Sequence, residues 1–289
     1  MLLTDFLDNH GVPYRRHGEN RHVSEGWVGM NCPQCEPHGG NYKLGVNLAT
    51  LAMTCWSCGP LNRVEALASL SGLGAKDVRE GLKLVDRQAK VRKGAGRLKM
   101  PDGLGPLLPV HKTYLRQERG FDPAEVERVW KVQATGQVSE LPWHLILPVY
   151  EGKDVVSWTA RKIRDDGRRY YTAPDERSII PIKQTLYGEQ YAAVSVLVLE
   201  GPLDVWAAGP GAVCTYGVGY TPAQLLRLTR YAKRVVAFDS DVAGRRRAAS
   251  LCAALSQYDG ETVNVLLDSK DVASASEKDK RLLRQEIGR

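Results

Sequence analysis

The sequence of 289 residues contains no apolar run approaching the roughly 18 residues of a membrane-spanning helix. Its first residues, Met1–Asp5, lack the basic region and the long apolar stretch of a signal peptide. The chain also lacks a G-x-x-x-x-G-K-[ST] motif, which excludes a P-loop ATPase. The absence of a membrane span and of a signal peptide predicts a cytoplasmic protein that has no membrane partner.

The composition indicates folded domains with an excess of positive charge. Hydrophobic residues make up 43% of the chain, enough to fill buried cores, and the length suggests roughly two or three domains. The net charge is +7 and the isoelectric point is about 9.1. This charge is compatible with a polyanionic partner such as a nucleic acid.

Four of the six cysteines form two C-x2-C pairs, Cys32 with Cys35 and Cys55 with Cys58, separated by nineteen residues. Each pair supplies two soft ligands from one tight turn, and four thiolates complete the tetrahedral shell of Zn2+. The spacing therefore predicts one structural zinc ion per chain, without the open position that catalysis needs. Since the shell is already complete, the nearby His22 and His38 are expected to be bystanders.

The residues around these pairs leave two interpretations of Trp56, which lies inside the second pair. Its ring either stacks on a nucleic-acid base or packs over the ribbon predicted at 42–46 and 51–54. The remaining cysteines, Cys214 and Cys252, lie in apolar segments and are expected to be small core residues.

Cysteine placement, glycine and proline content, and hydrophobic periodicity divide the chain into four parts. We expect a zinc-binding ribbon domain at 1–85 and a flexible basic linker at 86–108. A mixed α+β subdomain at 109–190 and a parallel-sheet α/β domain with a C-terminal helix at 191–289 follow.

Local patterns predict the elements within these parts. Apolar residues at helical spacing occupy 64–70 and 78–85, and β-type runs at 145–150 and 155–160 flank a turn and predict a hairpin. After residue 194, short strands and helices alternate, which implies a parallel sheet. Its strands are expected at 194–199, 212–215, 234–238 and 262–267, and its helices at 203–208, 222–231 and 242–256.

Two acidic motifs follow two of these strands, Glu200-Gly-Pro-Leu-Asp204 and Asp239-Ser-Asp241. The carboxyl ends of parallel strands share one edge of the sheet, where α/β proteins bind ligands. Clustered carboxylates repel one another unless a cation lies between them, and oxygen ligands suit Mg2+ or Mn2+. We therefore expect a divalent-cation site at this edge, although a lone Asp-x-Asp is usually a solvated turn.

The pairing of Glu-Gly-x-x-Asp with Asp-x-Asp-x-Ala-Gly resembles the Toprim domain of topoisomerases and bacterial-type primases. With the zinc ribbon, basic linker and hairpin-bearing middle segment before it, the chain resembles bacterial-type and phage primases over nearly its whole length. This family has a third acidic element after the last strand of the sheet. Asp271 matches that element best, and Asp268 is the alternative.

The resemblance implies metal-dependent nucleotidyl transfer that makes short RNA primers on single-stranded DNA from ribonucleoside triphosphates. It assigns Mg2+ or Mn2+ to Asp239, Asp241 and Asp271. Glu200 becomes a general base or a further metal ligand, supported by Asp204. It also implies a template-gripping zinc ribbon, a replicative helicase acting in trans and, for a phage protein, the host cytoplasm.

The same resemblance suggests which basic residues contact template and nucleotide phosphates: Arg161, Arg169 and Lys183. As a charge pattern alone, such a run is usually a solvated face. The three arginines at 245–247 begin the helix after Asp-x-Asp, where a phosphate could bind or the side chains could face solvent.

Two other classes share some of these features. A DNA-binding recombination mediator joins a four-cysteine finger to a Toprim domain without polymerising, but it lacks the middle segment from Arg161 to Lys183. A type I topoisomerase needs a catalytic tyrosine in a large further domain, for which this sequence has no room.

Overall fold

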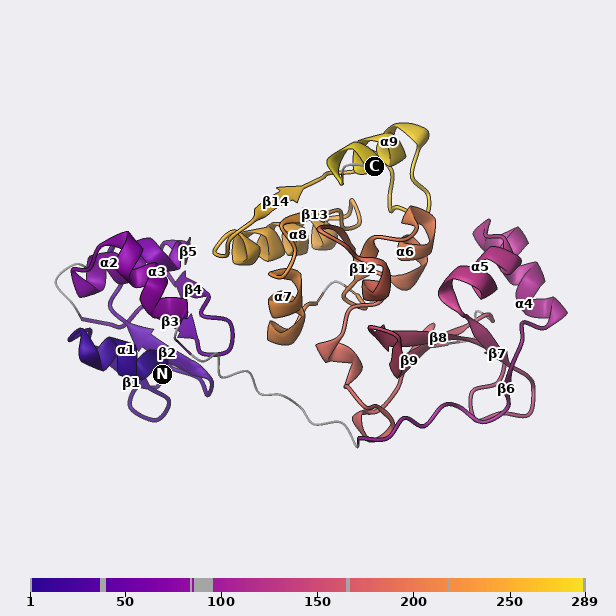
Figure 1. The fold of residues 1–289 in the computed structure, drawn as a ribbon, viewed down its shortest axis with the longest axis horizontal. Helices are drawn as coiled ribbons and strands as arrows, with labels where there is room; N and C mark the ends of the chain where they lie inside the picture. The colour runs from indigo at the N-terminus through magenta and orange to yellow at the C-terminus, as the bar shows by residue number, and fades with distance from the viewer. Residues whose placement is uncertain are drawn as a thin grey trace. The chain divides into compact units, whose positions relative to one another are not determined.

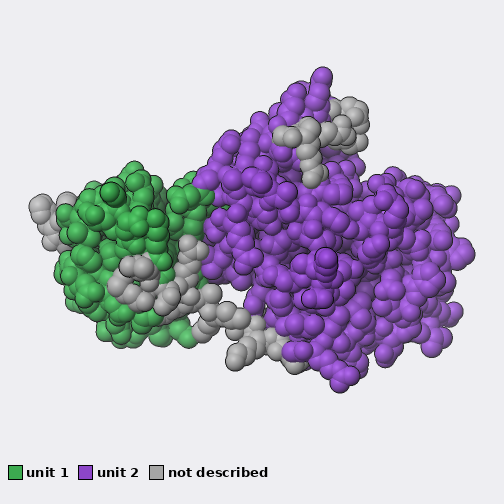
Figure 2. Space-filling model, in the orientation of Figure 1, with its two compact units in different colours: residues 1–90, 253–259 green, residues 91–252, 260–289 purple. Residues whose placement is uncertain are grey.

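The computed structural model describes residues 2–36, 40–83, 85, 96–164, 167–217 and 219–287. The chain forms two compact units, which are coloured separately in Figure 2. The first comprises Met1–Lys90 with Ala253–Asp259, and the second comprises Val91–Cys252 with Gly260–Arg289. In the part of the chain that the structure describes, no helix is both long and apolar enough to cross a bilayer.

The first unit is built on an antiparallel sheet of five strands in the order β1-β2-β3-β4-β5 (Figure 1). Met30, Leu44 and Met53 from this sheet share a buried core with Phe6 and Leu67 from the helices. The elements are α1 (Leu3–Asn9), β1 (Tyr14–Arg16), β2 (Trp27–Met30), β3 (Leu44–Asn47), β4 (Met53–Cys55), β5 (Gly59–Leu61), α2 (Arg63–Ser71) and α3 (Ala75–Lys83).

The helices expected at 64–70 and 78–85 are confirmed as α2 and α3. Asn62 begins α2 because its side chain accepts hydrogen bonds from the backbone N–H groups of Val64 and Glu65. Gly72, in the left-handed conformation, ends it.

The second unit begins with an antiparallel sheet in the order β10-β9-β8-β7-β6. Its longest strands, β8 and β9, form the hairpin that the sequence predicts at 145–160. The elements are β6 (Leu104–Gly105), α4 (Pro109–Thr113), a π-helical turn (Tyr114–Glu118), α5 (Pro123–Trp130), β7 (Gln133–Thr135), β8 (His144–Glu151), β9 (Asp154–Lys162) and β10 (Tyr170–Thr172).

The rest of the second unit is a parallel sheet in the order β12-β11-β13-β14, with a helix after each strand (Figure 1). The strands and helices that the sequence predicts here are confirmed, with ends that differ by a few residues. The elements are β11 (Ser195–Leu199), α6 (Pro202–Ala208), β12 (Ala212–Cys214), α7 (Pro222–Leu228), β13 (Lys233–Val236), α8 (Val242–Leu255), β14 (Glu261–Asn264) and α9 (Glu277–Glu286).

One continuous core joins the two sheets of the second unit. Leu145 and Leu147 from β8 belong to the same buried cluster as Leu197 from β11 and Val235 from β13. The alternate, inward-facing residues of the hairpin therefore pack against the strands that carry the acidic motifs.

The structure differs from the expected linker at 86–108. Residues 86–95 lie outside the described residues, but Leu98, Met100 and Leu104 pack against the cluster around Trp158. The backbone oxygen of Lys99 accepts a hydrogen bond of 3.0 Å from the Trp158 indole. This half of the segment belongs to the second unit, because its apolar side chains, spread among glycine and proline, are partly buried against that cluster.

Candidate functional site

The four paired cysteines converge in the first unit. The Sγ atoms of Cys32 and Cys58 are 3.9 Å apart, those of Cys35 and Cys55 are 3.6 Å apart, and all four lie within 4.8 Å of one another. A zinc ion with Zn–S bonds of about 2.3 Å sets its ligands about 3.8 Å apart at the corners of a tetrahedron. The spacing of the thiols therefore fits a zinc ion bound by all four.

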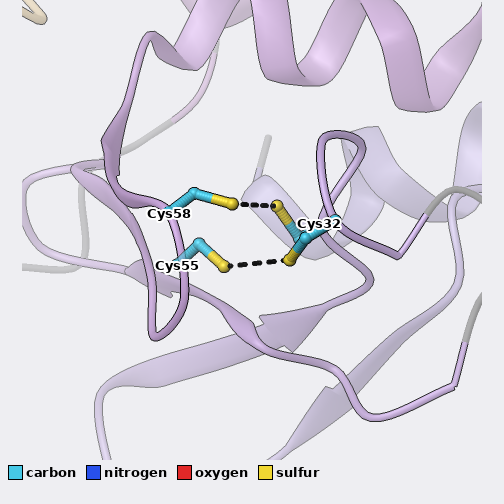
Figure 3. Close-up of side chains that lie close together, drawn as sticks. Cys32, Cys55 and Cys58 are labelled. Atoms are coloured by element: carbon cyan, nitrogen blue, oxygen red, sulfur yellow. Dashed lines mark hydrogen bonds between the residues drawn. The ribbon is translucent and has the colours of Figure 1, made fainter.

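The two knuckles approach from different strands. Cys32 lies two residues after β2, and Cys55 is the last residue of β4, so the sheet brings the pairs together. Figure 3 shows Cys55 and Cys58 facing Cys32 across the site. Burial opposes ionisation of Cys55, but the backbone N–H groups of Cys58 and Ser57 outweigh it and lower the pKa of this thiol to about 7.

The exposure of Trp56 argues against the interpretation in which its ring packs over the ribbon. Its side chain is 71% exposed rather than packed over the ribbon. Its ring meets the His22 ring edge-on, with centroids 5.5 Å apart. His22 is not part of the cysteine group, and His38 lies outside the described residues.

The acidic motifs meet at the carboxyl edge of the parallel sheet. Glu200 directly follows β11 and Asp239 lies just beyond β13, its neighbour in the sheet. The Asp239 backbone N–H donates a hydrogen bond of 3.0 Å to Glu200 Oε1, which ties the two strand ends together. Asp241 accepts a bond of 2.7 Å from the Gly244 N–H in the first turn of α8.

The carboxylates lie close enough for the negative charge of one to raise the pKa of another. Burial and the nearby charge of Asp239 raise the pKa of Glu200 to about 7. Burial, followed by the charges of Asp239 and Asp271, raises the pKa of Asp204 to about 6. The pKa of Asp239 is also raised, by burial and by Asp271 and Asp241.

Asp271 lies close enough to the acidic motifs to affect the pKa of their carboxyl groups. Its charge acts on both Asp204 and Asp239, whereas Asp268 is exposed and pairs with Lys278 at 2.6 Å. The Lys270 carbonyl accepts a hydrogen bond of 2.9 Å from the Ser240 N–H, which holds the loop of Asp271 beside the Asp-x-Asp motif. The geometry thus separates two residues that the sequence leaves as alternatives.

Asp204 adds negative charge to the site and also binds the backbone of two loops. Its carboxylate accepts a hydrogen bond of 3.2 Å from the Gly201 N–H and another from the Ala273 N–H. It therefore connects the turn after β11 to the loop that carries Asp271.

The donor set suits a hard divalent cation, since every member is a carboxylate whose ionisation the others oppose. The carboxylates are nevertheless more widely spaced than the thiols. Among the described residues, the cysteines are the one group of three or more His, Cys, Asp or Glu residues close enough to share an ion. A cation at the acidic site would draw these oxygens closer together.

The basic residues named from the resemblance lie in three different settings. Arg161 differs from the expectation: it is 6% exposed, its Nε donates to the Tyr114 hydroxyl at 2.8 Å, and its guanidinium lies over the Tyr170 ring. Lys183 is half-buried, and its Nζ donates to the carbonyls of Thr215 and Tyr216 after β12. Arg169 is exposed in the turn before β10.

Sequence reasoning missed Tyr170 and Gly244. Burial raises the pKa of Tyr170 to about 12 and the charge of Asp204 adds to the rise, so Tyr170, on β10 of the antiparallel sheet of the second unit, lies near Asp204. A Cβ atom on Gly244 would lie 2.2 Å from the Asp239 carbonyl oxygen and 2.9 Å from Glu200 Oε1. The sequence could have indicated Gly244, because it is the glycine of the Asp-x-Asp-x-Ala-Gly motif.

The parallel sheet and its acidic edge define a Toprim-like domain. Residues 197–275 match the protein-family model described as Toprim-like. Among solved structures, the Escherichia coli primase catalytic core is similar at 20% identity and a TM-score of 0.51, over 63% of this chain and 74% of that one. The second unit therefore has the fold of a primase catalytic core.

Two further solved structures are similar to this chain with lower TM-scores. The zinc-binding and RNA polymerase domains of the Aquifex aeolicus primase match 100% of this chain and 83% of that one, at 15% identity and a TM-score of 0.46. The primase fragment of the bacteriophage T7 primase-helicase protein matches 90% and 100%, at 13% identity and a TM-score of 0.44. No curated protein matches the sequence. The Toprim-like match and the fold shared with the Escherichia coli primase catalytic core agree with the resemblance to primases that the sequence indicates.

Proposed function

We propose that the protein is a DNA-dependent RNA primase, which makes short RNA primers on single-stranded DNA. The observation that carries this proposal is the convergence of Glu200, Asp204, Asp239 and Asp271 at the carboxyl edge of a Toprim-like sheet. Carboxylates raise one another's pKa only at a cost to folding, so their gathering supports a site that works with a bound cation.

The carboxylates have three kinds of task in this proposal. Asp239, Asp241 and Asp271 would hold Mg2+ or Mn2+, which would supply positive charge to neutralise the charge that develops on the triphosphate. Asp204 orients the two loops that carry the ligands, through its bonds to the backbone N–H groups of Gly201 and Ala273.

Glu200 is suited to accept a proton near neutral pH, because its pKa is about 7. The 3′-hydroxyl oxygen of the growing chain forms a bond to the α-phosphorus of the incoming ribonucleotide. The bond from that phosphorus to the pyrophosphate group breaks, and the hydroxyl proton passes to Glu200.

The zinc ribbon would grip the template and Arg169 and Lys183 would contact phosphates, with a replicative helicase acting in trans. Arg169 is the exposed member of that pair, whereas Lys183 needs to exchange its carbonyl partners for a phosphate. Arg161, bonded inside the core, supports β9 and β10 instead.

The decisive experiment incubates the full chain with pooled single-stranded DNA, four ribonucleoside triphosphates and Mg2+, and sequences any RNA produced. Template-dependent RNA supports the proposal, and Glu200→Gln should abolish it. If the protein binds DNA but makes no RNA with either Mg2+ or Mn2+, the recombination-mediator class is favoured instead.

A further inference from the structure

A cleft of about 620 Å³ opens on the first unit, next to the second cysteine knuckle. Aromatic rings and cations line it: His22, Tyr42 and Trp56, with Arg21 and Lys43. The Trp56 ring is largely exposed, and the Arg15 guanidinium lies 4.6 Å from the centroid of the Tyr42 ring. Flat π faces beside positive charges are the surface on which single-stranded nucleic acids stack their bases.

Two side chains flanking the first knuckle hold one wall of this cleft, the segment Gly40–Lys43. Asn31 Oδ1 accepts hydrogen bonds from the backbone N–H groups of Gly40, at 3.1 Å, and Tyr42, at 3.3 Å. The Glu36 carboxylate accepts hydrogen bonds from the backbone N–H groups of Asn41 and Lys43, both at 3.0 Å. Every backbone N–H along the wall therefore has a fixed partner.

The same side chains connect the wall to the cysteines. Glu36 is buried, and it also accepts a hydrogen bond of 3.4 Å from the Cys32 N–H. On the far side, the Lys43 carbonyl accepts the N–H of Trp56 at 3.1 Å. The wall thus spans from the first knuckle to the second.

Tyr42 shows that this wall is constrained. Its φ of 54° lies in the left-handed region, which costs a non-glycine residue about 1 kcal/mol or more. The bonds from Asn31 and Glu36 to the N–H groups of Tyr42 and Lys43 offset that cost. The backbone is bent where the tyrosine ring and the lysine enter the cleft.

A second cleft of about 380 Å³ shares His22, Tyr42 and Trp56 with the first. Its floor includes Gly45, where a Cβ atom would lie 3.3 Å from the Trp27 ring. Because Gly45 has no side chain, the Trp27 ring can lie close to its backbone. The shared aromatic residues form a partition between two adjoining spaces.

We infer that these two clefts are the template-reading track of the zinc ribbon, and that Asn31 and Glu36 are its positioning residues. Successive unpaired bases of single-stranded DNA would occupy the two clefts on either side of the Tyr42 and Trp56 rings. Asn31 and Glu36 act through the wall and touch neither the base nor the metal. The inference rests on the proposed function for its substrate, and it adds the residues that set sequence preference.

The test measures sequence preference by binding, so that it does not depend on RNA synthesis. The full-length protein selects from a pool of random-sequence single-stranded DNA, and zinc content and melting temperature are measured for each variant. Asn31→Ala and Glu36→Ala should flatten the preference at least tenfold while one zinc per chain is retained. Asn31→Asp keeps the accepting oxygen and should restore it. Glu80→Ala, which removes an exposed carboxylate from α3, is the matched control.

Trp56→Ala provides a second route, because this exposed ring can be removed without touching a ligand. It should weaken selection at least tenfold, and Trp56→Phe should recover part of it. Unchanged preference in Trp56→Ala, loss of zinc in Asn31→Ala, or failure of Asn31→Asp to restore preference would each overturn the inference. A wild-type protein that selects sequences but makes no RNA would contradict the proposed function and leave the track intact.

Discussion

At the scale of single residues, the acidic site separates carboxylates that look alike in the sequence. Asp268 and Asp271 are three positions apart, but only Asp271 acts on Asp204 and Asp239. The resemblance favours Asp271, but residue patterns alone do not show which carboxylate lies beside the motifs, because that depends on the fold of the loop after β14.

Asp239→Ala tests the role of these charges directly. We expect primer synthesis to fall by about a hundredfold or more, the loss typical of removing a charge-stabilising group. The melting temperature should stay the same or rise slightly, since repulsion from Asp241 and Asp271 is relieved. Asp268→Ala, which removes an exposed carboxylate nearby, should leave synthesis unchanged. An early melt of Asp239→Ala would instead identify these carboxylates as structural.

The raised pKa values of Glu200 and Asp204 predict a pH dependence of stability. A carboxyl group whose folded pKa exceeds its unfolded pKa stabilises the fold at low pH, and this contribution is lost as pH rises through the folded pKa. For Asp204 the loss runs from its ordinary pKa of 3.8 to its folded pKa of about 6, and for Glu200 from 4.5 to about 7. Without divalent cations, thermal melts should therefore show a decline across this window that is smaller in Glu200→Gln. Mg2+ should reduce the decline in the wild type, and identical profiles for wild type and variant would contradict the assignment.

At the scale of elements, the first turn of α8 packs directly on the end of β13, and Gly244 makes this approach possible. Gly244→Ala should destabilise the second unit by about 1–3 kcal/mol, the usual cost of overpacking, and should also displace Asp239. Ala249→Ser, on an exposed position of the same helix, is the control. Denaturant unfolding together with primer synthesis measures both effects, and a Gly244→Ala variant with wild-type values would show that the backbone can move aside.

Elements whose sequence patterns are local could be predicted, whereas contacts between residues far apart in the sequence could not. The parallel strands and the β8–β9 hairpin could be predicted because apolar runs and turns recur at short range. The burial of Arg161 could not be predicted, because its partner Tyr114 lies 47 residues away and a charge pattern does not show such a contact. Leu98 and Met100 were assigned to a linker because their burial depends on Trp158, which is equally remote in sequence.

At the scale of the whole molecule, two units with separate cores predict separable activities. A fragment beginning at Gly96 keeps the contacts of Leu98 and Lys99 with the second unit. It should extend a dinucleotide supplied on a template, but it should not choose a start site. Extension assays and sequencing of RNA 5′ ends measure the two activities. A fragment that initiates with unchanged site preference would show that the first unit does not read the template.

The cysteine site and the carboxylate site lie in different units, and of their side chains only the thiol groups are open to oxidation. Cys35 and Cys58 are exposed residues, whereas Cys214 in the second unit is fully buried. An oxidant that reaches these two cysteines would remove zinc ligands from the first unit and leave the carboxylates of the second unchanged. In the proposed primase, oxidation would then stop the initiation of new RNA chains, while chains already begun could still be extended.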